Sequence, residues 1–267
     1  MDALTFPSSE TPFLEPYLPK PKTNKDDLPF TTLTFATSLD SSLALSPGTR
    51  TILSGPQSKA MTHYLRRHHD AILVGVGTAT VDNPGLNCRI QGTGGYGGEG
   101  LQGQPRPIVL DPSARWEFDE QSKILQLAGE GRGRAPWIMT GSGVTVPEER
   151  KRILERYGGK FISLDVIEGK GFDWADLLRR LKTEGFESVM IEGGGTVINS
   201  LLGPEFQHLI DSVIVTIAPT WLGQGGVVVS PKPRFDVNGA AVAASRLKGV
   251  QWHPFGEDVV LCGRIGQ

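Results

Sequence analysis

Three apolar stretches are each followed by polar residues or glycines that could contact a ligand. One such junction reads Glu192-Gly193-Gly194-Gly195-Thr196, between a predicted strand and a predicted helix. Consecutive glycines expose backbone N–H groups at the helix start, where the helix dipole favours an anion such as a pyrophosphate. Glu192 ends the strand and is expected to face the crevice in which α/β sheets bind ligands. A purely structural turn is the alternative, and the carboxylate beside the glycines favours ligand binding.

A second junction is residues 75–89, with the sequence GVGTATVDNPGLNCR. Its glycines follow a predicted strand and lead into a loop where a ligand could approach the backbone, but they do not form the GxGxxG dinucleotide fingerprint. The Thr78 hydroxyl, the Asp82 carboxylate and the Arg89 guanidinium could meet a cofactor amide, a sugar and a phosphate. An Asx turn closed by Asn83-Pro84 explains the segment equally well by itself.

The third junction follows the first predicted strand and reads Ala36-Thr37-Ser38-Leu39-Asp40. Polar residues at the carboxyl end of a strand can point into a ligand crevice. Ser and Asp also cap backbone groups in ordinary turns, and this segment alone favours that interpretation.

Basic residues near the second junction are further candidates. Arg66 and Arg67 lie late in a predicted helix, where an arginine pair is more often a solvated face, although a guanidinium fork suits phosphate. His63, His68 and His69 lack zinc-site spacing and have no supporting carboxylate or Cys cluster. We therefore interpret the histidines as surface or packing residues and expect no metal site.

Several catalytic motifs are absent from the sequence. It contains no H-x-E with a downstream P-C-x-x-C, which excludes a zinc deaminase site. It contains neither a Walker lysine motif nor a G-x-S-x-G nucleophile elbow.

Alternating strands and helices must position these junctions, which predicts an α/β fold with a mostly parallel central sheet. The hydrophobic patterns predict helices over 56–69, 147–157, 173–185 and 195–202. They predict strands over 30–36, 71–76, 107–110, 136–139, 161–164, 188–191, 211–218, 245–252 and 258–263. The last two strands are expected to be an antiparallel finish to a mixed sheet.

Two segments differ from this pattern. Residues 1–29 are rich in Pro, Lys and acidic side chains and are predicted to form an extended N-terminal arm. Residues 91–105 contain seven glycines and are predicted to be a mobile surface insertion within a single domain that spans 30–267.

The composition limits the class of protein and its partners. The chain has 267 residues and a formal net charge of −2, which gives no basic field for nucleic acid or an anionic membrane. Two cysteines, Cys88 and Cys262, suggest a reducing compartment. With no apolar run long enough to span a bilayer and no secretory signal, we expect a cytoplasmic protein.

Taken in this order, the three junctions and Ala218-Pro219-Thr220-Trp221-Leu222-Gly223 resemble the riboflavin-biosynthesis reductase family. The resemblance runs from about Pro29 to the C-terminus and implies a dihydrofolate-reductase-like fold. The arm sequence PFLEPYLP (residues 12–19) looks like that of fungal members. Because the chain lacks a deaminase domain, it resembles the monofunctional fungal and archaeal type. That type reduces 2,5-diamino-6-ribosylamino-4(3H)-pyrimidinone 5′-phosphate before deamination.

The resemblance implies a role for each matching residue. Positions that match the NADPH-binding positions of the family are Ala36, Thr78, Asp82, Gly193, Gly194, Gly195 and Thr196. Positions that match its substrate-binding positions are Arg66, Leu86, Arg89 and Glu192, with the arginines as phosphate ligands. Ser41 departs from the pattern, because the family usually has glycine there.

The implied chemistry is reduction of an opened ribosylamine by the nicotinamide cofactor. Glu192 or Asp82 is expected to position the sugar hydroxyls or to relay a proton. The family resemblance also implies a homodimer. Three alternatives stay open: a reductase of the same fold acting on a pterin-like heterocycle, a non-catalytic NADPH-binding protein, and a phosphosugar-binding module.

Overall fold

The computed structural model describes residues 2–20, 27–233, 235–236, 238–242 and 245–266. Its main feature is a nine-stranded sheet with the order β14-β15-β12-β1-β11-β3-β6-β7-β8. These strands are β1 (Phe30–Thr37), β3 (Ala71–Gly75), β6 (Arg106–Leu110), β7 (Trp137–Gly141), β8 (Lys160–Leu164), β11 (Ser188–Gly193), β12 (Ser212–Ile217), β14 (Leu247–Phe255) and β15 (Asp258–Ile265). Seven neighbouring strands from β12 to β8 run parallel, whereas β15 is antiparallel to both β12 and β14. The prediction of a mixed, mostly parallel sheet with antiparallel C-terminal strands is confirmed.

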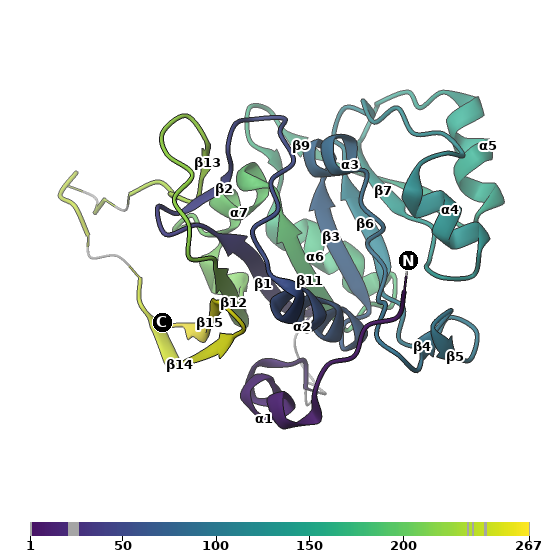
Figure 1. The fold of residues 1–267 in the computed structure, drawn as a ribbon. Helices are drawn as coiled ribbons and strands as arrows, with labels where there is room; N and C mark the ends of the chain where they lie inside the picture. The colour runs from purple at the N-terminus through teal and green to yellow at the C-terminus, as the bar shows by residue number, and fades with distance from the viewer. Residues whose placement is uncertain (1, 21–26, 234, 237, 243–244, 267) are drawn as a thin grey trace.

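Helices cover both faces of the sheet (Figure 1). On one face, α6 (Trp174–Thr183) and α7 (Gly195–Leu201) pack over Leu33, Leu73 and Ile191. The other face is covered by α2 (Pro56–Arg67), α3 (Val76–Asp82), α4 (Lys123–Gly129) and α5 (Glu148–Arg156). Burial on both faces explains why the parallel strands are continuous apolar runs in the sequence. Within the described residues, no helix is both long and apolar enough to cross a membrane.

Helix starts show why the sequence folds this way locally. Asp173 caps α6 as predicted, since its carboxylate accepts hydrogen bonds from the backbone N–H groups of Ala175 at 2.9 Å and Asp176 at 3.0 Å. Pro56 occupies the first position of α2, where its missing N–H costs nothing. The loop predicted after Gly75 is wrong, because helix α3 begins at Val76 directly after β3. The helix ends at Asp82, and its C-cap Asn83 has a left-handed φ of 41°.

The N-terminal arm is not extended over its whole length. Residues 8–17 form three short helical turns, which are η1 (Ser8–Glu10), α1 (Thr11–Leu14) and η2 (Glu15–Tyr17). Leu14, Tyr17 and Leu18 are buried against α2 and against the sheet, in contact with Met61, Ile214 and Val260 among others. The prolines that suggest extended backbone stand at early helix positions, where proline is tolerated. The arm is thus part of the apolar core.

The Gly-rich segment 91–105 has more structure than its composition predicts. Thr93, Tyr96 and Gln104 are buried, and the two-residue strands β4 (Thr93–Gly94) and β5 (Gly97–Gly98) pair with each other. The Gln104 amide accepts from the backbone N–H of Cys88 at 2.8 Å and donates to the Cys88 carbonyl at 2.7 Å. The segment therefore supports the chain beside Cys88, and the division into an arm and one domain stays a prediction.

Four short strands border the ligand side of the sheet. They are β2 (Ser42–Ala44), β9 (Val166–Ile167), β10 (Gly171–Phe172) and β13 (Val227–Val228). The turn η3 (Gln207–Leu209) precedes β12 and lies at the opposite edge. Strand β13 pairs with β2, and β10 pairs with β9. Both cysteines, Cys88 and Cys262, are free and buried.

Candidate active site

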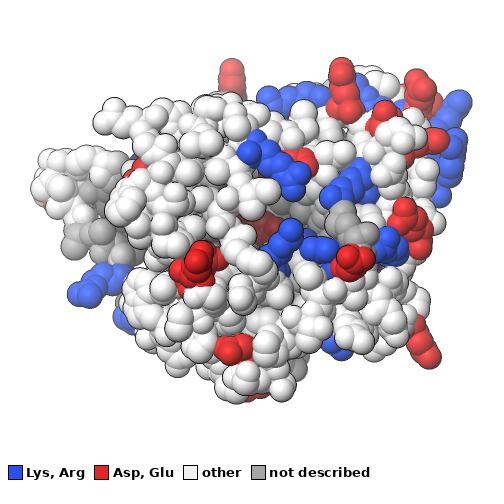
Figure 2. Space-filling view, viewed as in Figure 1, with Lys and Arg blue, Asp and Glu red and all other residues white. Residues whose placement is uncertain are grey.

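Two adjoining cavities open at the carboxyl ends of β3 and β11, next to α3 and α7. The first has a volume of about 600 Å³ and the second about 350 Å³. Both are lined by Leu43, Thr51, Thr78, Asp82 and Gly194. The second and third sequence junctions, which are separated by more than a hundred residues in the chain, therefore meet at one site. Figure 2 shows Lys and Arg side chains around a hollow on this face of the molecule.

The glycine turn after β11 belongs to the first cavity. Gly193 and Gly194 have positive φ values of 91° and 32°, which side chains rarely adopt. Gly194, Gly195 and Thr196 line the cavity, whereas Gly193 is buried beneath it. A Cβ on Gly194 would lie 2.8 Å from the Thr78 hydroxyl, and that hydroxyl donates to the Gly193 carbonyl at 3.4 Å. Only glycine leaves room for the close approach of the α3 and α7 turns.

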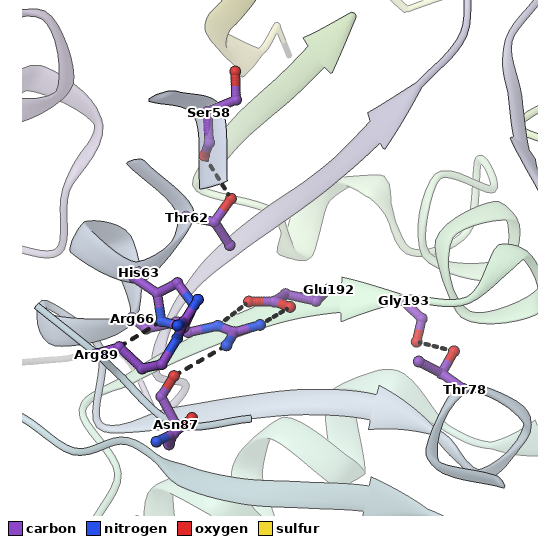
Figure 3. Close-up of polar contacts among 9 residues, drawn as sticks. All are labelled: Ser58, Thr62, His63, Arg66, Thr78, Asn87, Arg89, Glu192 and Gly193. Carbon is purple, nitrogen blue, oxygen red and sulfur yellow. Dashed lines mark hydrogen bonds and ion pairs between the residues drawn. The ribbon is translucent and has the colours of Figure 1, made fainter. Parts of the chain in front are cut away.

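Arg66 and Glu192 form a bidentate ion pair that borders the second cavity (Figure 3). Arg66 Nε and Nη2 each donate to one Glu192 carboxylate oxygen at 2.7 Å, and Nη1 donates to the Asn87 carbonyl at 3.0 Å. Burial works to lower the pKa of Arg66, but the charge and hydrogen bonds of Glu192 outweigh it and raise that pKa. All three guanidinium nitrogens are thus engaged, in contrast to the solvated arginine that its helix position suggests.

Arg89 lies behind this pair and does not line either cavity. Only 9% of its surface is exposed, and its Nη1 donates to the Asp2 carbonyl at 3.3 Å. Its backbone and side chain both contact His63, and burial lowers its pKa. The two predicted phosphate ligands, Arg66 and Arg89, are therefore neighbours. Arg89 is surrounded by protein, and its side chain does not face either cavity.

Asp82 is the predicted carboxylate that faces both cavities. It ends α3, and no hydrogen bond from a described residue reaches its carboxylate. Burial raises the pKa of Asp82 above its ordinary value, and the charge of Arg50 opposes this rise. A desolvated carboxyl at a cavity wall is suited to hold or release a proton.

Ala36, near the end of β1, and Leu86 also line the second cavity. The backbone of Leu86 has a positive φ of 46°. Ser41 has a φ of 60°, so the backbone there adopts the conformation that favours glycine. This conformation explains why the family usually has glycine at the position of Ser41.

Several residues of the site were not predicted from the sequence. Arg50 and Ser54 line the second cavity, Arg115 and Lys170 line the first, and the Asn87 carbonyl binds Arg66. They come from loops whose approach to the site depends on the tertiary fold. Only Asn87 carried a local signal, because it lies between two predicted ligand positions. Among the described residues, no group of three or more His, Cys, Asp or Glu side chains could hold a metal ion.

The RibD C-terminal domain family matches residues 29–261, which include every element of this site. The chain belongs to this family. It is 39% identical to the 2,5-diamino-6-ribosylamino-4(3H)-pyrimidinone 5′-phosphate reductase of Debaryomyces hansenii, over 99% of this chain and all of that protein. The protein of the same name from Eremothecium gossypii is 43% identical over 94% of each chain.

Solved structures agree with this family membership. The riboflavin biosynthesis reductase of Saccharomyces cerevisiae superposes with a TM-score of 0.75 at 36% identity, covering 96% of this chain and all of that one. RibD of Acinetobacter baumannii gives a TM-score of 0.69 at 23% identity, with 90% of this chain and 59% of that chain covered. The second comparison shows that this fold is shared at low sequence identity.

Proposed function

We propose that this chain catalyses the NADPH-dependent reduction of 2,5-diamino-6-ribosylamino-4(3H)-pyrimidinone 5′-phosphate to its ribitylamino product in riboflavin biosynthesis. The observation that carries the proposal is the meeting of Asp82, the Arg66–Glu192 pair and the glycine turn at two adjoining cavities. Relatives bearing the name of that reductase match almost the whole chain. One cavity suits a dinucleotide and the other suits a phosphorylated sugar.

The volume and the hydrogen-bond donors of the first cavity suit NADPH. Its volume lies within the range of cofactor sites. The start of α7 offers backbone N–H groups from Gly195 and Thr196 to a pyrophosphate, with no side chain at Gly194 or Gly195 in the way. When bound, NADPH supplies the hydride that reduces C1′ of the opened ribosyl group.

Two cations line the same cavity beyond the glycine turn and favour NADPH over NADH. Arg115 and Lys170 are exposed and line the wall next to Pro112. The Asp111 carboxylate accepts from the backbone N–H groups of Arg115 at 3.0 Å and Trp116 at 2.8 Å, which fixes the turn that presents Arg115. A guanidinium is well suited to the 2′-phosphate that distinguishes NADPH.

The second cavity is assigned to the substrate. Arg66 and Arg89 supply positive charge for the 5′-phosphate, while Leu86 and Ala36 offer apolar contact to the rest of the ligand. The Glu192 carboxylate already accepts two hydrogen bonds from Arg66, so we assign it to orienting Arg66 and the sugar hydroxyls. We assign the proton transfer to the ring oxygen, as the ribose opens, to Asp82, because its carboxyl group faces both cavities and burial raises its pKa, which is the direction that a proton donor requires.

We also propose a homodimer that pairs through strand β14. This strand ends the sheet, and Val250 and Trp252 are exposed by 38% and 60%. An open edge strand with exposed apolar side chains is a site for pairing with another chain. Light scattering of purified protein tests this proposal, with Trp252→Arg expected to convert a dimer to a monomer. A wild-type monomer at micromolar concentration would contradict it.

Incubation with NADPH and the pyrimidinone ribotide tests the proposed reaction. We expect substrate-dependent loss of the reduced nicotinamide absorbance and formation of the ribitylamino product. The deaminated ribotide and a pterin serve as competing substrates in the same assay. Turnover of the pterin alone would favour the heterocycle reductase, and ligand binding without turnover would favour a binding module.

A further inference from the structure

His63 is a buried histidine that faces the arginines of the proposed substrate site. It lies on α2 one turn before Arg66 and is 6% exposed. The backbone N–H of Arg89 donates to His63 Nδ1 at 3.2 Å, and Arg89 Nε lies 3.3 Å from His63 Nε2. Figure 3 shows the imidazole beside both guanidinium groups. The ring therefore contacts the main chain and the side chain of one residue at once.

The surroundings of His63 keep its ring uncharged. Burial, together with the positive charges of Arg66, Arg89 and Lys59, lowers the pKa of His63 to about 2, while the backbone of Asn87 acts in the opposite direction. A protonated ring would add a third positive charge next to two arginines. The neutral ring instead provides an acceptor between them.

A neutral imidazole cannot satisfy both N–H groups of Arg89. One ring nitrogen carries a proton, so only the other can accept a hydrogen bond. If Nδ1 accepts from the Arg89 backbone, Arg89 Nε–H faces a second donor and lacks an acceptor on the ring. Arg66, in contrast, has Glu192 and the Asn87 carbonyl as acceptors for its three nitrogens. Arg89 instead lies behind Arg66, between the His63 ring and the Asp2 carbonyl.

We propose that His63 is a positioning residue that holds the Arg89 charge directly behind Arg66, where it adds positive potential for the phosphate of the substrate. The inference rests on the proposed function, because it requires a phosphorylated ligand in the second cavity. It assigns a purpose to one histidine of the His63, His68 and His69 group, which sequence spacing alone marks as packing. His69 differs, since its ring bonds the Leu65 carbonyl at 2.7 Å and the Thr32 hydroxyl at 2.8 Å away from the arginines.

The test compares His63→Leu and His63→Asn, with His69→Leu as a matched control. Leu removes both ring nitrogens, whereas the Asn amide oxygen can replace Nδ1 as an acceptor for the Arg89 backbone. All three proteins are assayed with the ribotide and with the same compound lacking its phosphate. Binding of ribose 5-phosphate and of ribose to each protein, measured by calorimetry, gives a second measurement that needs no turnover.

We expect His63→Leu to raise KM for the ribotide and the Kd of ribose 5-phosphate about tenfold, because the Arg89 charge would no longer be held behind Arg66. The values for the compounds lacking phosphate are expected to change less than twofold. His63→Asn is expected to bind the phosphorylated ligands nearly as well as wild type. His69→Leu is expected to lower the melting temperature without weakening the binding of phosphorylated ligands selectively. Equal losses with and without phosphate, or the same discrimination in His69→Leu, would overturn the inference.

Nitrogen NMR of the histidine rings gives a test that also works if a variant does not fold. The His63 ring of the wild-type protein is expected to stay in one neutral tautomer, protonated at Nε2, from about pH 5 to pH 8, whereas a free histidine titrates near pH 6.5. Titration of His63 in that range would contradict the inference. If the wild-type protein reduces no ribotide, the proposed function fails. If it reduces the ribotide but the His63 variants bind phosphate normally, only this inference fails.

Discussion

Arg66 on α2 and Glu192 at the end of β11 join two layers of the fold through paired hydrogen bonds of 2.7 Å. Their side chains are only 13% and 17% exposed. The pair therefore links the helix that borders the substrate cavity to the strand that leads into the glycine turn. A change in either residue is therefore expected to affect the second cavity and the strand that carries the glycine turn.

Glu192→Gln is expected to reduce both stability and substrate binding. The Gln amide keeps one acceptor but leaves the buried Arg66 charge unpaired, at a cost of about 1–3 kcal/mol in the free energy of unfolding. Urea unfolding and KM for the ribotide measure the two effects. Glu187→Gln is the control, because its partner Lys182 lies in an exposed ion pair. A change below about 0.5 kcal/mol in Glu192→Gln, like that of a surface pair, would contradict the assignment.

Asp82→Asn is expected to stabilise the fold while it lowers turnover. The pKa of Asp82 is raised in the folded protein, so its ionised form is destabilising above that pKa and the cost disappears as the pH falls below the unfolded value. The variant should therefore melt higher than wild type near pH 7 and equally near pH 3. Its kcat should fall steeply because the proposed proton donor is lost. Wild-type kcat in Asp82→Asn would remove Asp82 from the mechanism.

Gly194→Ala is expected to weaken cofactor binding more than any change at an open glycine. The new Cβ would lie 2.8 Å from Thr78 Oγ1 and would occupy a backbone conformation that costs about 1–3 kcal/mol. We expect a rise in KM for NADPH of about tenfold or more, measured at saturating ribotide. Gly143→Ala provides the comparison, because Gly143 also has positive φ but has no atom within 4 Å of the added Cβ. Equal cofactor KM values in the two variants would argue against a pyrophosphate at this turn.

Arg115→Gln is expected to change cofactor preference. Loss of one charge-assisted contact to the 2′-phosphate should raise KM for NADPH about tenfold and leave KM for NADH nearly unchanged. Steady-state kinetics with both cofactors measures the ratio. Arg152→Gln on α5 removes the same charge elsewhere and should leave that ratio intact. An unaltered ratio in Arg115→Gln would place the 2′-phosphate at another residue, with Lys170 the next to test.

Leu14→Ala is expected to destabilise the protein as a core substitution does, although Leu14 lies in the arm. The side chain is fully buried, and truncation of a buried Leu costs about 2–5 kcal/mol. Chemical denaturation gives the value. Leu45→Ala, at a Leu that is 52% exposed, should cost far less. Similar losses in the two variants would mean that the arm does not pack on the sheet in solution.

The sheet could be predicted well from the sequence because its strands are buried on both faces and read as continuous apolar runs. Each predicted strand of the central sheet is present, and the Asp173 cap locates α6. Helix α3 could not be predicted, because its seven residues include a glycine and four β-branched side chains that favour other conformations. Its helical state depends on packing of Val76 and Ala79 in the core.

The site was predictable where sequence position fixes geometry. Asp82, Glu192 and the glycine turn follow strand ends, and parallel strands bring such ends to one edge. The enclosure of Arg89 was not predictable, because it depends on Asp2 and His63 from distant parts of the chain. Arg115 and Lys170 reach the first cavity from loops whose paths only the tertiary fold determines.

The Gln104 amide bonds to Cys88 in the manner of a neighbouring strand, and this restricts how the protein can be engineered. The abundance of glycine in 91–105 suggests a convenient place for an epitope tag, a protease site or a shortened loop. Any of these changes would break the hydrogen bonds between Gln104 and Cys88, which is next to Arg89, and we expect them to reduce catalysis. Tags are better placed in an exposed turn away from both cavities, such as the one around Gly185 between α6 and β11.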